Sequence, residues 1–450
     1  MNKNLNITNT LTGRKENFVP INKKKVGMYV CGPTVYDFPH IGNARPLVVF
    51  DVLFRILIKI FGKDKITYVR NITDIDDKII EASKKKGISI SELTNEVTKE
   101  FHLNCVSLFC MKPTVEPKAT DHVNEMISMT DNLIKLKAAY EKKGHVYFSV
   151  SSFKGYGKLS NKKIDELKIG ARVEVSDLKN DPLDFVLWKP SNKDEPGWNS
   201  PWGRGRPGWH LECSVMSEKY LGKNFDIHGG GLDLIFPHHE NEIAQSCSNN
   251  NTKSFANYWV HNGFVTINRE KMSKSLGNVI TISDAVNKYS GQVVRLALLS
   301  AHYSQPLDWN EKLLSSQKNT LDKWYSIYTE KEKNTSEVDE ILLDDINTPG
   351  YIAKLHDLYN AASKGDEEKK SKFNKACKLI GLFDLSKEEW ESLKKSKINV
   401  SESYIKNKIE ERVKAKNNGN FDLADKIRDE LSSKGIIIED QKDKTIWKVK

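Results

Sequence analysis

FDIHGGGLDLIFPHHENE, residues 225–242, combines a β-like run, three consecutive glycines and several potential metal ligands. A β-like run ends in three glycines, and Pro237 then stands at a position typical of the first helical residue, so the pattern predicts a strand, a ligand-facing loop and a helix start. His238 and Glu242 are four residues apart, which places imidazole and carboxylate on one helix face, where both can bind one divalent metal. A solvated or capping pair near a helix start is the alternative interpretation.

Two ligands do not complete a structural metal site, so further ligands have to come from elsewhere in the chain. The candidates are Cys31, which follows an apolar run, and Cys213, which lies within PGWHLECS at residues 207–214. Thiolates combined with an imidazole favour zinc over magnesium or calcium. The six cysteines are too few and too scattered for a disulfide framework in a chain of this length, so we expect reduced thiols.

The composition is that of a globular protein. The chain has 450 residues, 38% hydrophobic and 29% charged, which is enough for roughly two to four domains with their own cores. A formal charge of +10 suits a polyanionic partner without naming one. The first twenty residues lack the apolar run of a signal peptide, and no uninterrupted apolar stretch is long enough to span a bilayer, so we expect a cytoplasmic protein.

The first half of the chain contains a strand, loop and helix in the order of a nucleotide-binding α/β unit. Residues 26–31 predict a buried strand, residues 32–43 a loop, and the apolar run that follows a long helix through about residue 61. His40 and Asn43 would point into the mouth of that loop. Residues 66–72 predict the next strand, and after Pro113 and Pro117 a further helix is predicted to run to about residue 143.

The second half contains a basic loop and a helical tail. Residues 257–267 predict a strand, and the loop at 268–278 carries Lys271 and Lys274, which suits contact with phosphate, although it can also be an ordinary basic surface loop. Trp198 and Trp202 lie in a segment that either lines a ligand or forms a surface hairpin packed on the insertion. After about residue 308 the pattern is mostly helical, ending in one or two amphipathic helices and a hairpin at 435–449.

With HIGN at 40–43 and KMSKS at 271–275 on either side of a split α/β domain, the chain resembles a class I aminoacyl-tRNA synthetase. Within that class, YVCGPTVYD (29–37), NITDIDDK (71–78), PGWHLECS (207–214) and the opening stretch are similar to the cysteinyl-tRNA synthetase family. The likeness spans nearly the whole chain. Asn43 departs from the family signature, which ends in histidine; asparagine can donate a hydrogen bond to phosphate but cannot carry a proton charge.

The resemblance implies an α/β fold: a Rossmann-like nucleotide-binding catalytic domain split by an insertion, then an α-helical bundle and a small mixed α/β C-terminal domain. The boundaries we expect are 1–115 for the first half of the catalytic domain, 116–205 for the connective insertion, 206–307 for the second half with the KMSKS loop, 308–400 for the helical bundle and 401–450 for a small anticodon-binding domain.

The resemblance also implies a ligase that activates L-cysteine with ATP to cysteinyl-adenylate and transfers the cysteinyl group to the 3′ end of tRNA(Cys). One Zn²⁺ would be held by Cys31, Cys213, His238 and Glu242. Zinc lowers the pKa of a thiol whereas a serine hydroxyl stays protonated, so a zinc that binds the substrate thiolate can separate the two amino acids. Mg²⁺ would accompany ATP, and we expect a monomer that binds no membrane.

By the same resemblance, four residues would stabilise charge on the phosphates in the transition state: His40, Asn43, Lys271 and Lys274. The residues expected to contact the amino acid or ATP are Gly32, Thr34, Thr73, Trp209, His228, Gly230, Asp233 and Lys274. Trp209 and His228 would wall the substrate side chain, and Thr73 would meet its ammonium group or serve only as a structural residue at a strand end.

Three other functions share some of these features. A ligase that transfers cysteine to an amino-sugar would share every catalytic motif but does not need the long C-terminal region. A noncatalytic zinc-containing RNA-binding protein would not need two phosphate motifs. A synthetase for another amino acid would keep its selectivity after zinc removal.

Overall fold

The computed structural model describes residues 4–162, 177–273, 276–329, 340–396, 400–441 and 445–449. The chain forms two compact units, one of residues 1–321 and 331–382 and the other of residues 322–330 and 383–450. Lys274 lies outside the described residues, and every other residue predicted for the site belongs to the first unit.

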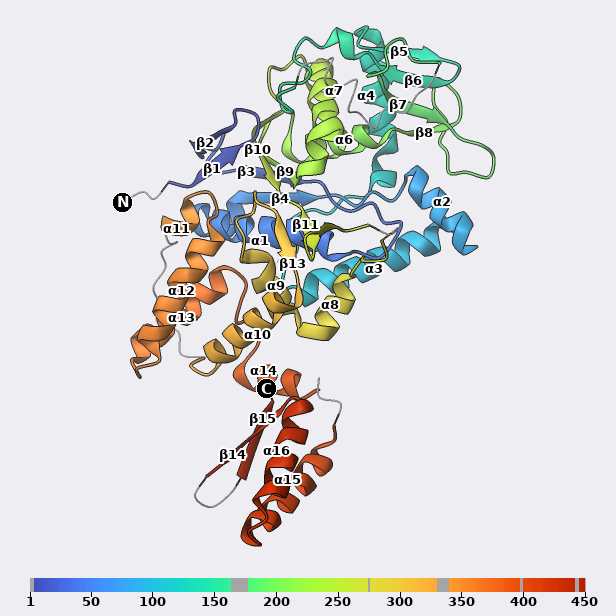
Figure 1. The fold of residues 1–450 in the computed structure, drawn as a ribbon. Helices are drawn as coiled ribbons and strands as arrows, with labels where there is room; N and C mark the ends of the chain where they lie inside the picture. The colour runs from blue at the N-terminus through green and yellow to red at the C-terminus, as the bar shows by residue number, and fades with distance from the viewer. Residues whose placement is uncertain are drawn as a thin grey trace. The chain divides into compact units, whose positions relative to one another are not determined.

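A parallel sheet forms the centre of the first unit (Figure 1). Its strands run in the order β10-β9-β3-β4, with bounds β3 (Val26–Val30), β4 (Ile66–Arg70), β9 (Phe225–Gly231) and β10 (Ala256–Asn262). All five residues of β3 are buried, as expected for a strand covered on both faces. The strands predicted at 26–31 and 66–72 are therefore confirmed.

The order of these strands fixes where ligands can bind. From β3 the chain passes to β4 on one side, and it later returns to β9 on the other side of β3. The direction of winding thus reverses between β3 and β9. In open α/β sheets the crevice at the carboxyl ends of strands at such a switch point is the usual ligand site, and Cys31 directly follows β3 there.

Helices cover both faces of the sheet (Figure 1). One face carries α1 (Ile41–Phe61) and, packed on it, α9 (Gly291–Leu299). The other carries α6 (Trp209–Leu221) and α7 (Glu240–Asn250). The long helix predicted through about residue 61 is confirmed, and it ends where Gly62 adopts a positive φ of 95°.

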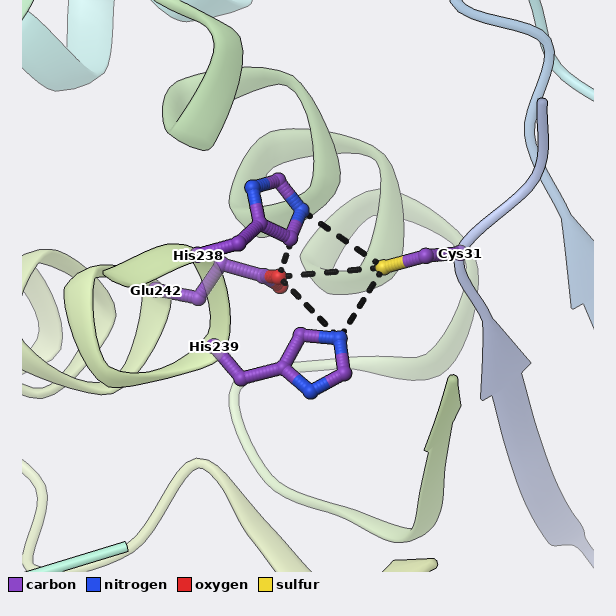
Figure 2. Close-up of side chains that lie close together, drawn as sticks. All are labelled: Cys31, His238, His239 and Glu242. Atoms are coloured by element: carbon purple, nitrogen blue, oxygen red, sulfur yellow. Dashed lines mark hydrogen bonds and ion pairs between the residues drawn. The ribbon is translucent and has the colours of Figure 1, made fainter. Parts of the chain in front are cut away.

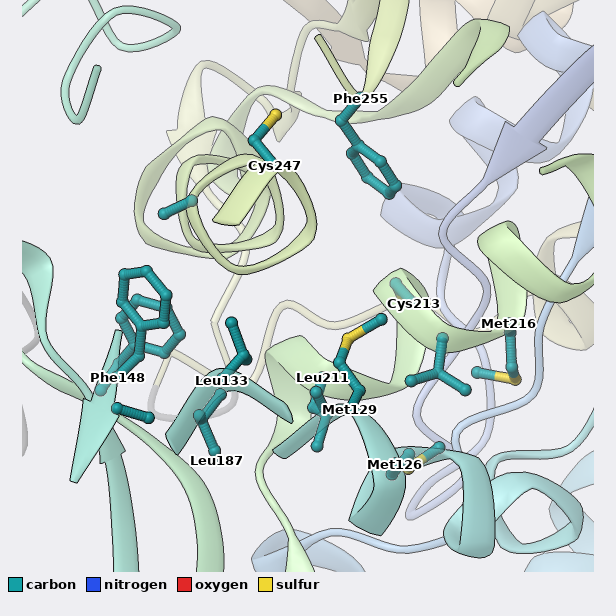
Figure 3. Close-up of a cluster of buried hydrophobic side chains, with 14 of the residues drawn as sticks. Met126, Met129, Leu133, Phe148, Leu187, Leu211, Cys213, Met216, Cys247 and Phe255 are labelled. Carbon is teal, nitrogen blue, oxygen red and sulfur yellow. The ribbon is translucent and has the colours of Figure 1, made fainter. Parts of the chain in front are cut away.

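Before α6, the segment between β4 and β9 includes residues 116–205, which are predicted to form the insertion. Its helices and strands are α2 (Asp77–Lys86), α3 (Ile90–Ser107), α4 (Val123–Lys135), β5 (Ala139–Lys142), β6 (His145–Phe148), β7 (Phe185–Pro190) and β8 (Gly205–Pro207), the strands forming an antiparallel sheet in chain order. A buried apolar cluster joins α4, this sheet and α6, with Leu133, Phe148 and Leu187 beside Leu211 (Figure 3). Because Cys213 belongs to the same cluster, this core positions its thiol.

Two local expectations are corrected by the structure, and one open alternative is decided. The helix expected to reach about residue 143 ends at Lys135, because Lys137 takes a positive φ of 58° and β5 follows. Pro237 is not the first residue of a regular helix: it follows a cis peptide bond inside a π-helical turn, Ile235–His239, and α7 begins at Glu240. Trp198 and Trp202 pack against the buried cluster of the insertion, as in the hairpin alternative.

Smaller elements complete the first unit. They are a hairpin of β1 (Asn6–Asn9) and β2 (Arg14–Asn17), a sheet of β11 (Val265–Ile267), β12 (Glu270–Lys271) and β13 (Leu307–Trp309), and the helices α8 (Ile282–Tyr289), α10 (Glu311–Tyr325), α11 (Glu340–Leu343), α12 (Thr348–Ala362) and α13 (Glu367–Leu379). The last residues of α10 belong to the second unit. The hairpin packs on β10, since Thr10 N–H donates to the Trp259 carbonyl at 2.8 Å.

The second unit confirms the predicted amphipathic helices and hairpin. It contains α14 (Lys387–Ser396), α15 (Glu402–Asn417), α16 (Phe421–Ser433), β14 (Ile436–Asp440) and β15 (Thr445–Val449). Ile405, Leu431 and Ile436 lie in its core, and Trp447 packs against that core. Across the described parts of both units, no helix has the length and apolar character needed to cross a membrane.

Candidate active site and metal centre

The end of β3 holds Cys31 in a fixed backbone position. Its N–H donates to the Gly229 carbonyl at 3.1 Å, and the next N–H, of Gly32, donates to Asn71 Oδ1 at 2.8 Å. A Cβ atom at residue 32 would lie 1.6 Å from the Asn71 carbonyl oxygen. Gly32 is therefore required by the close approach of two backbone segments.

Four potential metal ligands converge at this strand end (Figure 2). One donor atom from each of Cys31, His238, His239 and Glu242 lies within 4.8 Å of the others. Cys31 Sγ is 3.6 Å from His238 Nε2, 3.3 Å from His239 Nε2 and 3.8 Å from Glu242 Oε1. His238 Nε2 lies 3.0 Å from Glu242 Oε1, which is the contact that the four-residue spacing predicts.

Cys213 reaches the same place from α6. Its Sγ lies 3.6 Å from Cys31 Sγ, and only 1% of the side chain is exposed. The structure therefore brings all four predicted ligands together. It also adds His239, which the sequence reasoning missed even though it lies three residues before Glu242 and so on the same face of a helix.

Four distances within the predicted set of ligands lie within ~0.4 Å of those in a tetrahedral zinc site. Bonds of ~2.3 Å to sulfur and ~2.1 Å to nitrogen or oxygen place two sulfurs ~3.8 Å apart, sulfur and a lighter donor ~3.6 Å apart, and nitrogen and oxygen ~3.4 Å apart. The corresponding distances here are 3.6 Å between the sulfurs, 3.6 and 3.8 Å from Cys31 to His238 and Glu242, and 3.0 Å between His238 and Glu242. The separation of 3.9 Å between His239 and Glu242 fits less well.

A shell of aromatic residues holds these ligands in place. His228 Nε2 lies 2.9 Å from Glu242 Oε2, and His210 Nδ1 lies 2.9 Å from His238 Nδ1. The Trp209 ring stacks on His238 with centroids 4.1 Å apart, and 37% of Trp209 is exposed. His228 is fully buried behind Glu242, where it orients that carboxylate. Trp209 thus lies at the solvent side of the ligands and His228 on the inner side.

A hydrogen-bonded chain runs from the N-terminal hairpin to the ligands. Thr10 Oγ1 lies 2.7 Å from His261 Nδ1, and His261 Nε2 lies 2.8 Å from His239 Nδ1. Since Nδ1 of His239 is engaged in this way, only Nε2 faces Cys31. No local pattern in the sequence could have revealed this chain, because its members come from segments about 250 residues apart.

The electrostatics of the cluster favour the ionised forms of Glu242 and Cys213 but not of Cys31, because burial, and after it the neighbouring Cys213, raises the pKa of the Cys31 thiol well above its usual value. Burial opposes ionisation of Glu242, but His228 and His238 outweigh it and lower the pKa of the carboxyl to about 2. Burial likewise opposes ionisation of Cys213, yet hydrogen bonds with Cys31 and His238 lower the pKa of its thiol to about 6. Burial, followed by the neighbouring His228 and His261, lowers the pKa of His239 well below its usual value, so this imidazole is neutral.

The other end of the crevice contains the two predicted phosphate motifs. The His40 N–H donates to Asn43 Oδ1 at 3.0 Å, which fixes the Asn43 amide in a capping box at the start of α1. Ile41 N–H donates to the Ile280 carbonyl at 3.0 Å, and a Cβ at Gly42 would lie 2.9 Å from Met272 Cε. The HIGN turn and the KMSKS loop therefore lie against each other. Lys271 is exposed at this loop.

The remaining predicted residues lie around the sheet edge. Thr34 forms a β-bridge with Thr73, which places both at the carboxyl ends of β3 and β4. A Cβ at Gly230 would lie 2.8 Å from His239 Cε1, so the space beside this glycine is filled by the ligand shell. Asp233 is exposed in the 3₁₀ turn Leu232–Leu234 that follows β9.

Comparison with known proteins assigns the class. Residues 17–319 match the family described as the tRNA synthetases class I (C) catalytic domain. A Mycobacterium tuberculosis methionyl-tRNA synthetase in complex with methionyl-adenylate has a similar fold, with a TM-score of 0.52 and 13% identity over 84% of this chain and 86% of that chain. The Agrobacterium radiobacter K84 LeuRS in a ternary complex with tRNA and LeuAMS gives a TM-score of 0.54 and 12% identity with the same coverage. The fold and the catalytic domain are those of a class I tRNA synthetase.

Closer relatives identify the family. A protein named Cysteine--tRNA ligase from Pelagibacter ubique (strain HTCC1062) is 59% identical over 453 residues, which cover 100% of both chains. Another of that name from Rickettsia bellii (strain OSU 85-389) is 51% identical and covers 98% of both. This chain belongs to the cysteine–tRNA ligase family. The match includes the long C-terminal region, which the amino-sugar alternative does not need.

Proposed function

We propose that this chain activates L-cysteine with ATP and attaches the cysteinyl group to tRNA(Cys). The observation that carries the proposal is the buried cluster of two thiols, an imidazole and a carboxylate at the switch point of the sheet, in a member of the cysteine–tRNA ligase family. Such a cluster supplies what recognition of a thiol requires, because soft sulfur ligands select a thiophilic metal and that metal then binds the substrate sulfur.

Zinc is the metal that the donor set fits, and Cys31, Cys213, His238 and Glu242 would hold it. When bound, zinc supplies a Lewis acid that accepts a substrate thiolate and discriminates against the hydroxyl of serine. The protein's own contribution is to hold the ligands in position. Gly32 allows the backbone after β3 to approach the Asn71 backbone closely, and His228 orients the Glu242 carboxylate from its buried side.

The side chains around the cluster bind and orient the amino acid and ATP. Trp209 forms the solvent-side wall, and Thr73, at the end of β4, meets the substrate ammonium group. Gly32, Thr34 and Gly230 line the strand ends, and Asp233 accepts hydrogen bonds from the ribose hydroxyls.

The phosphate motifs act on the charge that develops when the cysteine carboxylate displaces pyrophosphate. His40, Asn43, Lys271 and Lys274 stabilise this charge, with Mg²⁺ accompanying ATP. The amide of Asn43 is already oriented, because its oxygen accepts from the His40 N–H and its nitrogen remains as the donor. Lys271 directly precedes Met272, which lies against the HIGN turn, and Lys274 follows three residues later in the sequence.

The helical region after β13 and the second unit are proposed to bind tRNA, with residues 401–450 at the anticodon. We still expect a monomer in the cytoplasm. All six cysteines are free thiols in the structure.

ATP-dependent attachment of labelled cysteine to bulk tRNA by the purified protein tests the proposal, with serine as the parallel substrate. We expect charging with cysteine and none with serine. Exchange of pyrophosphate with cysteine but no transfer to tRNA would instead support the ligase with a small acceptor.

A further inference from the structure

The loop between Cys31 and His40 carries two aromatic rings that the proposed function leaves unassigned. The loop runs from the end of β3, where the potential metal ligands meet, to the N-cap of α1, so it lies along the crevice from the amino-acid end to the phosphate end. Tyr36 is half-buried in this loop, and 40% of Phe38 is exposed. A single exposed ring is ordinary on a protein surface, but here both rings share a second feature.

Each ring has a lysine ammonium group over it. The Lys78 ammonium lies 5.6 Å from the ring centroid of Tyr36, and the Lys86 ammonium lies 5.6 Å from the ring centroid of Phe38. Both lysines are exposed and belong to α2, one in its first turn and one in its last. At this range a cation is attracted to the face of an aromatic ring. The loop and the helix thus form two neighbouring pairs of an aromatic ring and a positive charge.

The two lysines keep their positive charge available. α2 carries four lysines against two acids. One of these acids, Asp77, is already paired, since its carboxylate lies 2.7 Å from Arg206 and 2.8 Å from Lys189. Lys78 and Lys86 form no ion pair with any residue that the structure describes, so their ammonium groups can face an anionic partner.

A single-stranded nucleic acid has the chemistry that this surface fits. Its bases present flat faces that stack on aromatic rings, and its phosphates are attracted to the lysines beside them. A duplex keeps its base faces stacked on one another, and a mononucleotide needs only one such pair, whereas the surface has two. In the proposed reaction the acceptor is the 3′ end of tRNA, which has to enter the crevice between the metal centre and the phosphate motifs, where this loop lies.

We propose that Tyr36 and Phe38, together with Lys78 and Lys86, form the surface on which the unpaired 3′-terminal nucleotides of tRNA enter the crevice. The rings stack on the bases and the ammonium groups meet the phosphates. The inference rests on the proposed function and deepens it, because it names the part of the tRNA that this face binds. Stacking tolerates any base, so this contact adds affinity and orientation, and recognition of the particular tRNA comes from other contacts.

The test compares two transcripts of tRNA(Cys), one complete and one lacking its unpaired 3′-terminal nucleotides. Binding of each to the full-length protein is measured by fluorescence anisotropy for wild type and for Phe38→Ala. The variant should bind the complete transcript about 5- to 150-fold more weakly, the range for loss of one base stacked on an aromatic ring, and the truncated transcript within about twofold of wild type. Phe38→Trp keeps a ring and should bind both transcripts as wild type does.

Lys86→Ala tests the phosphate contact. Each lysine contact to the phosphates of a single strand contributes about 0.7 to the slope of log affinity against log salt, so this variant should lower the slope for the complete transcript by that amount and weaken binding about fourfold near 0.15 M salt. Lys84→Ala is the matched control, because Lys84 is an exposed lysine of the same helix that instead lies 3.3 Å from Glu195. It should keep the wild-type slope.

Cysteine-dependent exchange of pyrophosphate measures activation without tRNA, and it should stay within about twofold of wild type in every variant. Loss of exchange in a folded Phe38→Ala protein, or equal weakening of the two transcripts, would overturn the assignment, and so would unchanged binding of the complete transcript. If Phe38→Ala does not fold, Lys86→Ala and its salt dependence decide in the same way. Wild-type protein that exchanges no pyrophosphate with cysteine would overturn the proposed function itself, and that failure appears without any substitution.

Discussion

Five donor atoms meet at the end of β3, yet a tetrahedral zinc site takes four, so substitution of Cys213 and of His239 should have different consequences. We predict that Cys213 rather than His239 is the fourth ligand; His238 and Glu242, which both sets share, depart from the tetrahedral distance by ~0.4 Å. The Cys213 sulfur departs from the tetrahedral distance to Cys31 by ~0.2 Å, whereas His239 departs by ~0.3 Å from its distance to Cys31 and by ~0.5 Å from its distance to Glu242. His239 also uses Nδ1 to hold His261.

The expected magnitudes follow from this assignment. A structural zinc site contributes about 10–16 kcal/mol from four ligands, or about 2.5–4 kcal/mol for each if they share it equally, so Cys213→Ser should weaken zinc binding about 70- to 900-fold. His239→Asn should weaken it only about 10- to 100-fold, because it removes an outer hydrogen bond to the Cys31 sulfur.

Chelator competition measures both affinities, and cobalt substitution identifies the ligands. The sulfur-to-cobalt charge-transfer absorption grows with the number of bound thiolates, so Cys213→Ser should lose about half of it, while His239→Asn should keep the wild-type intensity. Cys247→Ser is the matched control, because Cys247 is a buried thiol outside the cluster. Full intensity in Cys213→Ser together with loss of zinc from His239→Asn would refute the assignment.

Three further outcomes follow from single contacts. Gly32→Ala should lower the free energy of unfolding by at least about 3 kcal/mol in urea titrations, because its Cβ would overlap the Asn71 carbonyl at 1.6 Å; a loss below about 1 kcal/mol would contradict the packing described. Burial lowers the pKa of His261 to about 3 from its usual 6.5, so its neutral form adds stability above about pH 6.5 that is lost as the pH falls toward 3. In the presence of a chelator, the titration of His261 should change the free energy of unfolding by about 1.4 kcal/mol per pH unit between pH 6 and 4, and His261→Asn should remove this contribution. Equal pH dependence of the unfolding free energy in wild type and variant would argue against the role of His261. Arg295→Met should cost about 3–5 kcal/mol in thermal or urea unfolding, because it leaves the buried Asp51 without this partner, and adding Asp51→Asn should recover part of the loss; additive losses would count against the pair.

Local signals in the sequence were sufficient for the main elements. An apolar run too short for a helix gives β3, and a long apolar run before Gly62 gives α1, because burial on one or both faces requires these patterns. Asp76 caps α2 by accepting from the Lys78 N–H, the side-chain contact for which Asp is favoured at this position. The helix boundary near residue 135 was predicted wrongly, because the positive φ of Lys137 has no sequence signature of its own.

The candidate ligands were also accessible from the sequence, since Cys31 follows a strand, and His238 and Glu242 are spaced for one helix face. The residues that surround these ligands could not be predicted from the sequence. Trp198 and Trp202 had two open interpretations until the packed core of the insertion decided for the hairpin. Residue type alone could not decide, because a tryptophan fits a ligand wall and a small core equally well.

The sequence by itself thus determined the order of strands and helices, the two phosphate motifs and a short set of possible metal ligands. Only the tertiary structure decided which groups surround them: it placed His261 beside His239 and Glu242 beside His228, and it turned Glu212 toward Thr73 across 139 residues of chain. The physical reason is that hydrogen bonds between buried side chains depend on the register and packing of segments distant in sequence, whereas propensity and periodicity report only on neighbours.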